Sequence, residues 1–251
     1  MPPTCDVLTF GETMLRLSPP GRARIEQADA FAVHVAGSES NVAVALARMG
    51  VRARWVSRLP DDGRGRRVAR SLAAHGVDVS GIRWDAEPGA RVGVFFVEHG
   101  TPPRPTTVVY DRAGSSASRL TPGDLPESLL ADCRHLHVTG ITPALSASCA
   151  EATAHAVRTA RRLNKTVSLD VNFRARLWSA ETAARTLAPL IERVDLLITA
   201  ADDARLLFGA DGGDGAAVSG ALRARFGVSA VAVTLGGEGA LLDAGNTITW
   251  V

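Results

Sequence analysis

The chain has 251 residues, of which 46% are hydrophobic and 22% charged, and its formal net charge is +2. These values predict one large domain over residues 1–251, or one domain with a small appendage, with a core large enough that disulfides are not needed for stability. Because we find no secretory signal and no apolar run of about 20 residues, we expect a cytoplasmic protein with no membrane partner. Cys5, Cys133 and Cys149 match no metal or disulfide spacing and are predicted to be small buried side chains.

The densest basic stretch, Gly63–Arg70, has two interpretations. It could form a nucleic-acid patch, or it could be the solvated face at the start of a helix. No aromatic residue interleaves the arginines, and Asp61 and Asp62 precede them. The solvated face is therefore favoured, and we expect no nucleic-acid partner.

The spacing of apolar residues switches repeatedly between the periods of strands and helices. Such alternation predicts an α/β fold with a central, mostly parallel sheet covered by helices on both faces. In chain order we expect a strand at 5–11, a helix at 39–50, a strand at 52–59, a helix at 65–76, a strand at 135–140, a helix at 146–164, a strand at 165–172, a helix at 181–194, a strand at 195–199, helices at 201–209 and 216–227, and a strand at 229–235.

Two segments, about 13–36 and 91–112, interrupt this alternation. Both look strand-like and neither contains a helix pattern. We expect them to form a small separate β-sheet that acts as a lid near the carboxyl ends of the main strands. At the other end of the chain, residues 246–251 alternate like a strand up to Val251, so we expect that the natural chain continues further.

Polar residues follow the apolar strand that contains Leu169. Asp170, Asn172 and Arg174 occupy alternate positions, so in an extended strand they would point the same way. Ligands of open α/β sheets bind at this end of the strands, and the arginine fork suits a carboxylate or phosphate. An Asp–Arg pair that ties the strand end to a loop explains the pattern equally well.

A Gly-Ser sequence precedes the first predicted helix. Gly37 would allow a ligand to approach the free N–H groups of the helix start. Ser38 or Ser40 could instead be an ordinary N-cap, which is the commoner arrangement.

Three glycines, Gly236, Gly237 and Gly239, follow the last apolar strand. A strand-like segment comes next, where a dinucleotide fingerprint would require a helix. A hairpin turn with left-handed glycines is the leading interpretation, and a turn that passes close to a nucleotide base is the functional alternative.

Two further residue pairs could carry chemistry. Tyr110 and Arg112 share one face of a lid strand and could hold an anionic small molecule, although surface positions of this kind are commoner without a function. His135 and His137 also share a strand face, but no third zinc ligand accompanies them.

In their order along the chain, "FGETMLRLSP", "VAGSESNVAVALARMG" and "VTLGGEGALL" resemble the ribokinase-like, PfkB-type carbohydrate kinases. The stretches "HLHVTGITPALS", "VSLDVNFRARLWS" and "LLFG" are similar to the 2-keto-3-deoxygluconate kinases of that family. The resemblance implies a three-layer α/β/α domain with a β lid. It also implies ATP- and Mg²⁺-dependent phosphorylation of a sugar acid to its 6-phosphate, and a possible homodimer through the lid.

The resemblance also implies roles for individual residues. Arg174 would position substrate and phosphoryl group, Asn172 would lie by the nucleotide, and Phe95 stands where related enzymes often have a tyrosine. The two arginines, Arg112 and Arg174, suit a carboxylate-bearing substrate; a neutral sugar, as in fructokinases or ribokinases, is the alternative. The implied substrate contacts are Gly37, Ser38, Asn41, Phe95, Tyr110, Arg112, Ile141 and Arg174, and the implied nucleotide contacts are Asn172, Thr234, Gly236 and Gly239.

The chain departs from the family pattern at two places. The family's Asn-x-x-Glu motif is matched by residues 200–203, Ala-Ala-Asp-Asp, where Asp203 could replace the acid at the Mg²⁺ shell. The family's Gly-Ala-Gly-Asp motif, which supplies an anion hole and a general base, would follow the last residue of this chain. The resemblance therefore implies that the 251-residue chain is inactive, either because it is truncated or because it is a non-catalytic sugar-binding relative.

Overall fold

The computed structural model describes residues 3–245 and 247–251. The chain divides into two compact units, Met1–Thr9 with Thr121–Val251 and Phe10–Leu120, which are described in turn as unit 1 and unit 2. Both predicted lid segments fall within unit 2.

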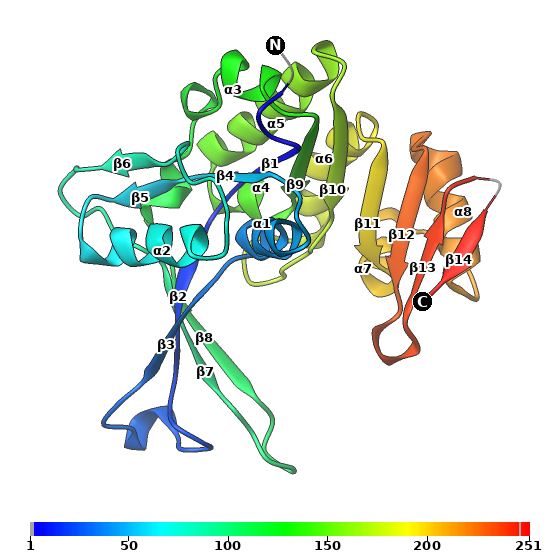
Figure 1. Cartoon of the computed structure of the whole chain (residues 1–251). Coiled ribbons are helices and arrows are strands. Elements are labelled where there is room, and N and C mark those ends of the chain that lie inside the picture. Colours follow the sequence, from blue (N-terminus) through cyan, green and yellow to red (C-terminus); the bar gives the residue numbers. More distant parts are fainter. Residues whose placement is uncertain (1–2, 246) are drawn as a thin grey trace. The chain divides into compact units, whose positions relative to one another are not determined.

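Unit 1 is built on a twisted, mostly parallel sheet (Figure 1). Its strands lie in the order β14-β13-β12-β11-β10-β9-β1; all neighbours from β1 to β12 are parallel, and β13 and β14 are antiparallel. The strands are β1 (Val7–Phe10), β9 (His135–Thr139), β10 (Thr166–Asp170), β11 (Leu196–Ala200), β12 (Ala230–Thr234), β13 (Ala240–Asp243) and β14 (Ile248–Trp250).

Helices cover both faces of this sheet, as the sequence pattern predicts. Ser168 and Leu169 are successive residues of β10, so their side chains point to opposite faces of the sheet. Both are buried, which shows that both faces are covered. The helical segments of unit 1 are η3 (Pro122–Asp124), α3 (Glu127–Ala131), α4 (Ile141–Leu145), α5 (Ala147–Arg162), α6 (Ala180–Ile191), α7 (Ala201–Phe208), α8 (Gly215–Phe226) and η4 (Gly236–Glu238).

Local chemistry sets where these helices begin and end. The Ser146 side chain accepts a hydrogen bond from the Cys149 N–H, 3.1 Å away, at the start of α5, and Asp214 caps α8 in the same way. Helix α7 ends at Gly209, whose φ of 59° is a left-handed conformation that glycine adopts without strain. The observed bounds of most helices and strands agree with the predicted ones to within a few residues.

Unit 2 contains a four-stranded sheet in the order β3-β2-β7-β8, which extends away from α1 and α2 (Figure 1). The two segments expected to form a small separate sheet supply all four strands, so that prediction is confirmed. The elements of unit 2 are β2 (Met14–Ser18), η1 (Ile25–Gln27), β3 (Ala32–Ala36), α1 (Ser38–Arg48), β4 (Ala53–Val56), β5 (Arg58–Pro60), α2 (Gly63–Ala73), β6 (Arg83–Asp85), β7 (Val94–Glu98), β8 (Thr107–Asp111) and η2 (Ser116–Arg119).

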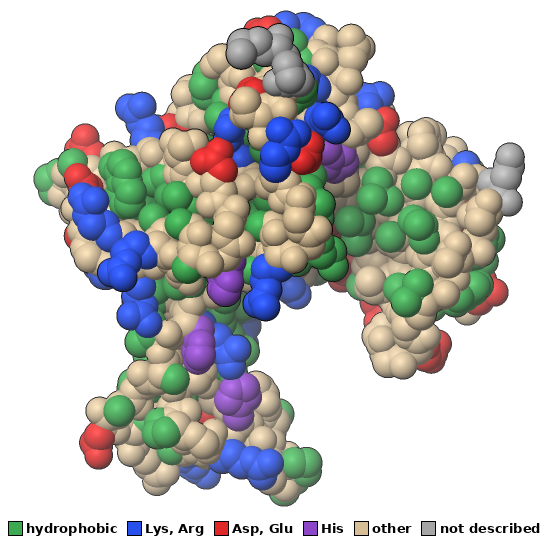
Figure 2. Space-filling model, in the orientation of Figure 1, with side chains coloured by type: hydrophobic (Ala, Val, Ile, Leu, Met, Phe, Trp, Pro, Cys, Tyr) green, Lys and Arg blue, Asp and Glu red, His purple; other side chains and the backbone are tan. Residues whose placement is uncertain are grey.

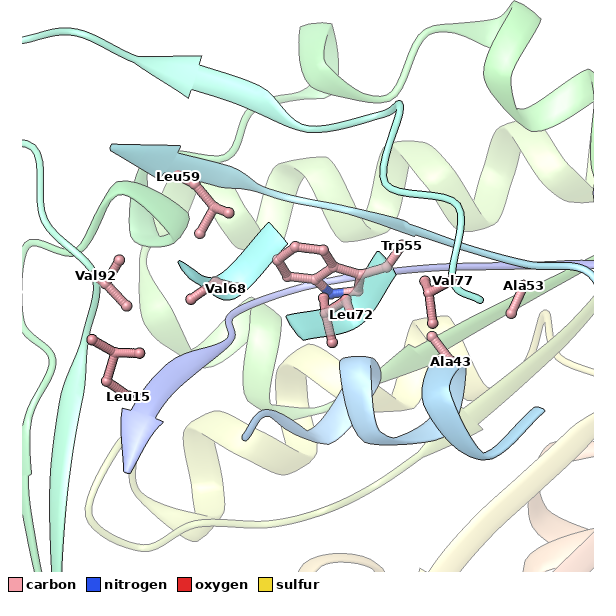
Figure 3. Packing of buried hydrophobic residues seen from close by; sticks show 9 residues of the cluster. All are labelled: Leu15, Ala43, Ala53, Trp55, Leu59, Val68, Leu72, Val77 and Val92. Atoms are coloured by element: carbon pink, nitrogen blue, oxygen red, sulfur yellow. The ribbon is translucent and has the colours of Figure 1, made fainter. Parts of the chain in front are cut away.

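A hydrophobic cluster around Trp55 forms the core of unit 2. Trp55 is fully buried, and Figure 3 shows it in one cluster with residues of α1, α2, β5 and β2. The buried members are Leu15, Ala43, Ala53, Trp55, Leu59, Val68, Leu72, Val77 and Val92. Because Leu15 lies on β2, one face of the lid sheet is anchored in this core.

Several sequence predictions need qualification. The strand expected at 52–59 is interrupted at Ser57, and the end of the chain forms β14, with residue 246 of that predicted strand outside the described residues. The three cysteines are free and buried, as predicted. Among the described residues, no helix combines the length and apolar character that a membrane span requires.

The basic stretch of α2 has acidic partners. Asp62 caps the helix through the Arg64 N–H, 2.8 Å away, and forms an ion pair with the Arg64 side chain; Asp61 pairs with Arg66. Such pairing fits the solvated-face interpretation of Gly63–Arg70.

Candidate active site: the lid face and the carboxyl edge

Two groups of candidate residues occur, one in each unit. The first lies on one face of the lid sheet and is called the lid face: His34, Arg16, Phe95, Tyr110 and Arg112. The register pairs His34 with Arg16, Arg16 with Phe95, and Phe95 with Tyr110. Residues directly opposite on neighbouring strands share a face, so these four side chains form one row across all four strands. Arg112 follows Tyr110 by two residues on the same face.

Aromatic stacking dominates the centre of the lid face. The rings of Phe95 and Tyr110 are stacked, with centroids 5.6 Å apart and planes at 25°, and the Arg112 guanidinium lies 5.7 Å from the centre of the Tyr110 ring. Tyr110 is 43% exposed, so its ring and hydroxyl are open to a ligand. A sugar ring or chain can pack on such a surface.

Arg112 is held by a buried carboxylate that the sequence prediction missed. Its Nε donates to Glu12 Oε2 at 2.7 Å, and a terminal nitrogen of Arg112 contacts the same oxygen. The other Glu12 oxygen accepts from the Ser115 hydroxyl at 2.5 Å. Glu12 is 2% exposed, so this pair is shielded from water and fixes the orientation of the guanidinium.

Two glycines make room for Glu12. A Cβ on Gly93 would lie 2.8 Å from Glu12 Oε1, and one on Gly37 would lie 2.3 Å from the Glu12 backbone oxygen. Gly37 is also the N-cap of α1, with no capping side chain, so neither Ser38 nor Ser40 is the N-cap. The alternative prediction that Ser38 or Ser40 caps this helix is therefore wrong. Asn41, one turn into α1, is exposed.

The second group lies in unit 1, where β10, β11 and β12 end side by side; we call it the carboxyl edge: Asp170, Asn172, Arg174, Asp203 and Thr234. Asp170 ends β10, Asp203 lies in the first turn of α7 directly after β11, and Thr234 ends β12. Parallel strands bring such residues to one edge of the sheet, where ligands of α/β proteins bind.

The loop after Asp170 differs from the extended strand that we predicted. Asn172 has a φ of 39°, in the left-handed region, so side-chain alternation does not hold from Asp170 to Arg174. The Asn172 N–H instead donates to Asp170 Oδ1, and its amide to Asp170 Oδ2, both at 3.1 Å. This is an Asx turn, and asparagine tolerates the backbone conformation better than most residues.

Charge interactions link the members of the carboxyl edge. The Phe173 N–H donates to Asp203 Oδ2 at 3.3 Å, which ties the loop to α7. Burial raises the pKa of Asp170 to about 6, and the Asn172 hydrogen bonds and the nearby Arg174 cation oppose this shift. Burial also raises the pKa of Asp203, opposed by the Phe173 N–H and by Arg174. Arg174 therefore lies close enough to influence both carboxyl groups.

Ile141 lies next to this edge. It begins α4 directly after Gly140, whose N–H donates to the Asp170 carbonyl at 2.8 Å. A Cβ on Gly140 would lie 2.2 Å from the Val171 oxygen, so glycine is required for this approach.

The glycine sequence after β12 forms a hairpin. Gly236 and Gly239 have φ values of 63° and 101°, and β13 returns antiparallel to β12. The hairpin interpretation is thus confirmed. The structure adds a second reason for Gly239, since a Cβ there would lie 2.1 Å from the Val251 oxygen. At Gly236 and Gly237 a Cβ would meet no described atom within 4 Å, which leaves their backbone open to a flat ligand.

A metal would find few protein ligands here. Among the residues that the structure describes, no three His, Cys, Asp or Glu side chains cluster as a metal site. Asp170 and Asp203 offer hard carboxylate oxygens, which suit Mg²⁺ held by one or two carboxylates together with water and substrate phosphates.

Known proteins resemble the chain over nearly its whole length. Residues 5–248 match the pfkB family carbohydrate kinases. The 2-dehydro-3-deoxygalactonokinase of Haloferax volcanii is 41% identical over 98% of this chain and 76% of its own length, and the 2-dehydro-3-deoxygluconokinase of Bacillus subtilis is 35% identical over 96% and 74%.

Solved structures agree with these relatives. The 2-dehydro-3-deoxygluconokinase of Thermotoga maritima superimposes with a TM-score of 0.92 at 34% identity, covering 98% of this chain and 79% of that one. A PfkB protein from Polaromonas gives a TM-score of 0.90 at 35% identity, covering 99% and 82%. The ribokinase-like fold expected from the sequence is therefore confirmed, and the chain belongs to the pfkB family of carbohydrate kinases.

Proposed function

We propose that the protein phosphorylates a six-carbon 2-keto-3-deoxy sugar acid, 2-keto-3-deoxygluconate or its galactonate epimer, on the 6-hydroxyl with ATP. The identity to two relatives named for these acids carries the proposal. The lid face supports it because it combines a stacked aromatic surface with guanidinium groups, which suits a polyhydroxylated anion. The two named relatives differ in the sugar, so both epimers are candidates.

The carboxyl edge offers some of the groups that phosphoryl transfer requires, but not the general base of the family's Gly-Ala-Gly-Asp motif. Arg174 would neutralise charge on the transferred phosphoryl group, where positioning and electrostatic stabilisation provide most of the catalysis. Asp203 and Asp170 would hold Mg²⁺ through their oxygens, and the open backbone at Gly236, with Thr234, would lie against the nucleotide. Bound ATP would supply the phosphoryl group, and Mg²⁺ would offset the charge of its phosphates.

The lid residues would recognise the sugar acid. Tyr110 offers a hydroxyl beside its ring, and Arg112 keeps donor capacity after pairing with Glu12. Gly37, Ser38 and Asn41 at the start of α1 remain predicted sugar contacts. A homodimer through the lid also remains a prediction, which light scattering of the purified protein would check.

A substrate panel tests the proposal. ADP release is measured with ATP and Mg²⁺ and, in separate reactions, 2-keto-3-deoxygluconate, the galactonate epimer, fructose or ribose, alongside calorimetric binding of the same sugars. We expect kcat/KM to be at least tenfold higher for one or both acids than for either neutral sugar. Preference for fructose or ribose would support the neutral-sugar alternative. Binding of an acid without ADP release would fit both explanations of an inactive chain, a truncated kinase or a non-catalytic sugar-binding relative, and the same panel on a chain that includes a Gly-Ala-Gly-Asp segment would distinguish them.

A further inference from the structure

The four strands of the lid sheet carry one arginine, Arg16, at the centre of β2. It lies directly beside Phe95 in the register, on the face that also presents Tyr110. Figure 2 shows histidine side chains (purple) next to a basic side chain (blue) on this sheet, in the lower part of the view. The row across the sheet therefore runs from a cation, over two stacked rings, toward Arg112.

The acids on and beside the lid strands already have other partners. Glu98 pairs with Arg104 at 3.1 Å, Asp111 with Arg91 at 2.7 Å, and Glu12 with Arg112. None of these three carboxylates is therefore matched to Arg16.

Arg16 contacts no carboxylate among the described residues. Its Nε donates to the Ser18 hydroxyl at 3.2 Å, and one terminal nitrogen lies 3.0 Å from His99 Nε2. These contacts hold the guanidinium in place and leave further N–H groups available to a ligand. The positive charge of Arg16 is thus uncompensated, whereas Glu12 compensates that of Arg112.

The dimensions suit a small acid. Neighbouring strands are about 4.8 Å apart, so Arg16 on β2 and Tyr110 on β8 are separated by about 10 Å at the backbone. The Phe95 ring lies between them in the row. A six-carbon chain lying on the aromatic pair could bring its carboxylate within reach of the long Arg16 side chain.

We propose that Arg16 is a specificity-determining residue that binds the carboxylate of the sugar acid and so selects acids over neutral sugars. This inference rests on the proposed function. Arg112, compensated by Glu12, then serves mainly to orient the ligand. The proposal predicts that charge at position 16 controls the preference for an anionic ligand over a neutral one of the same shape.

The test compares binding of 2-keto-3-deoxygluconate with that of its primary amide, which is neutral and nearly isosteric, by calorimetry on the full chain. In Arg16→Met, which removes the charge and keeps an extended side chain, we expect Kd for the acid to rise about 10- to 100-fold, as a lost charge-assisted hydrogen bond would cause. Kd for the amide should change less than twofold, and Arg16→Lys should recover part of the preference. Arg24→Met is the matched control, because Arg24 is an exposed arginine of unit 2 paired with Glu26.

Each other outcome has a distinct meaning. If the wild-type protein prefers the acid and Arg16→Met weakens the binding of acid and amide equally, Arg16 has only a structural role and the inference is wrong. It is also wrong if Arg16→Met binds the acid as the wild-type protein does. If the wild-type protein binds neither ligand, or does not prefer the acid, the proposed function itself fails.

Discussion

Replacement of His137 by asparagine should remove a defined part of the acid sensitivity of folding. His137 lies on β9 and is 5% exposed, and its Nδ1 is 2.8 Å from the Ser168 hydroxyl. Its Nε2 is buried and has no hydrogen-bond partner among the described residues. Burial, with a smaller contribution from neighbouring His135, lowers the pKa of His137 from 6.5 to about 4. The folded protein therefore holds the neutral imidazole, and protonation favours unfolding.

The direction and size of this pH effect follow from the difference between the folded and unfolded pKa values of His137. Because the pKa is lower in the folded state, the stability contributed by His137 is fully present above pH 6.5 and is lost as the pH falls toward 4. The pKa difference corresponds to about 3 kcal/mol in total, of which about 2 kcal/mol is lost between pH 7.5 and pH 5. Asparagine keeps a polar atom near the position of Nδ1 but does not titrate.

Urea unfolding followed by circular dichroism at several pH values measures the effect. We expect His137→Asn to be less stable than the wild-type protein at pH 7.5, since a smaller side chain leaves a cavity. From pH 7.5 to pH 5, however, it should lose about 2 kcal/mol less of its unfolding free energy than the wild-type protein does. His75→Asn, at an exposed histidine, is the matched control for the substitution itself. Equal pH dependence of His137→Asn and the wild-type protein would refute this reasoning.

Three further substitutions test other parts of the structure. Gly37→Ala would place a Cβ 2.3 Å from the Glu12 backbone oxygen. We therefore expect urea unfolding to show a loss of more than about 2 kcal/mol in unfolding free energy, and calorimetry to show weaker sugar binding. A variant as stable and as tightly binding as the wild-type protein would contradict this contact. Glu12→Gln leaves the Arg112 cation buried without its counter-charge and should cost about 3 kcal/mol of stability by the same assay, whereas an unchanged midpoint would show that the pair contributes nothing. Asp170→Asn removes a carboxyl group whose raised folded pKa contributes stability as the pH falls through about 6. From pH 7.5 to pH 5 the variant should therefore lose more unfolding free energy than the wild-type protein does, and an equal loss in urea unfolding would contradict the raised pKa.

Regular elements were predictable because they repeat a local pattern. The helix at 146–164 is α5, which apolar periodicity and the Ser146 cap mark, and the strand at 165–172 is β10, which a short apolar run marks. Helix α4 (Ile141–Leu145) was not predicted, because five residues are too few to show a helical period. Strand β6 (Arg83–Asp85) was not predicted either, because three residues are too few to show the alternation of a strand.

The candidate site was less predictable, because its key contacts join residues far apart in sequence. Glu12 lies 100 positions from Arg112, and no local pattern marks it as the partner of that arginine. The one available signal was Gly93, since a glycine within a predicted strand segment often marks a close approach; in the structure it directly precedes β7 (Val94–Glu98). At Asn172 the local signal was misread, because Asp-x-Asn at the end of a strand also favours an Asx turn.

The buried Glu12–Arg112 pair has a consequence for how the lid could recognise its ligand. A paired guanidinium has a fixed orientation, but the pair has no net charge, so it attracts an anion less strongly than an unpaired arginine does. Arg16 keeps its charge but is only partly buried, so its attraction for an anion is reduced by solvent. Orientation and charge selection would then reside on different arginines of the lid. Under this arrangement a substitution at position 16 alters selectivity while the lid keeps its fold, and a substitution at Glu12 disturbs both.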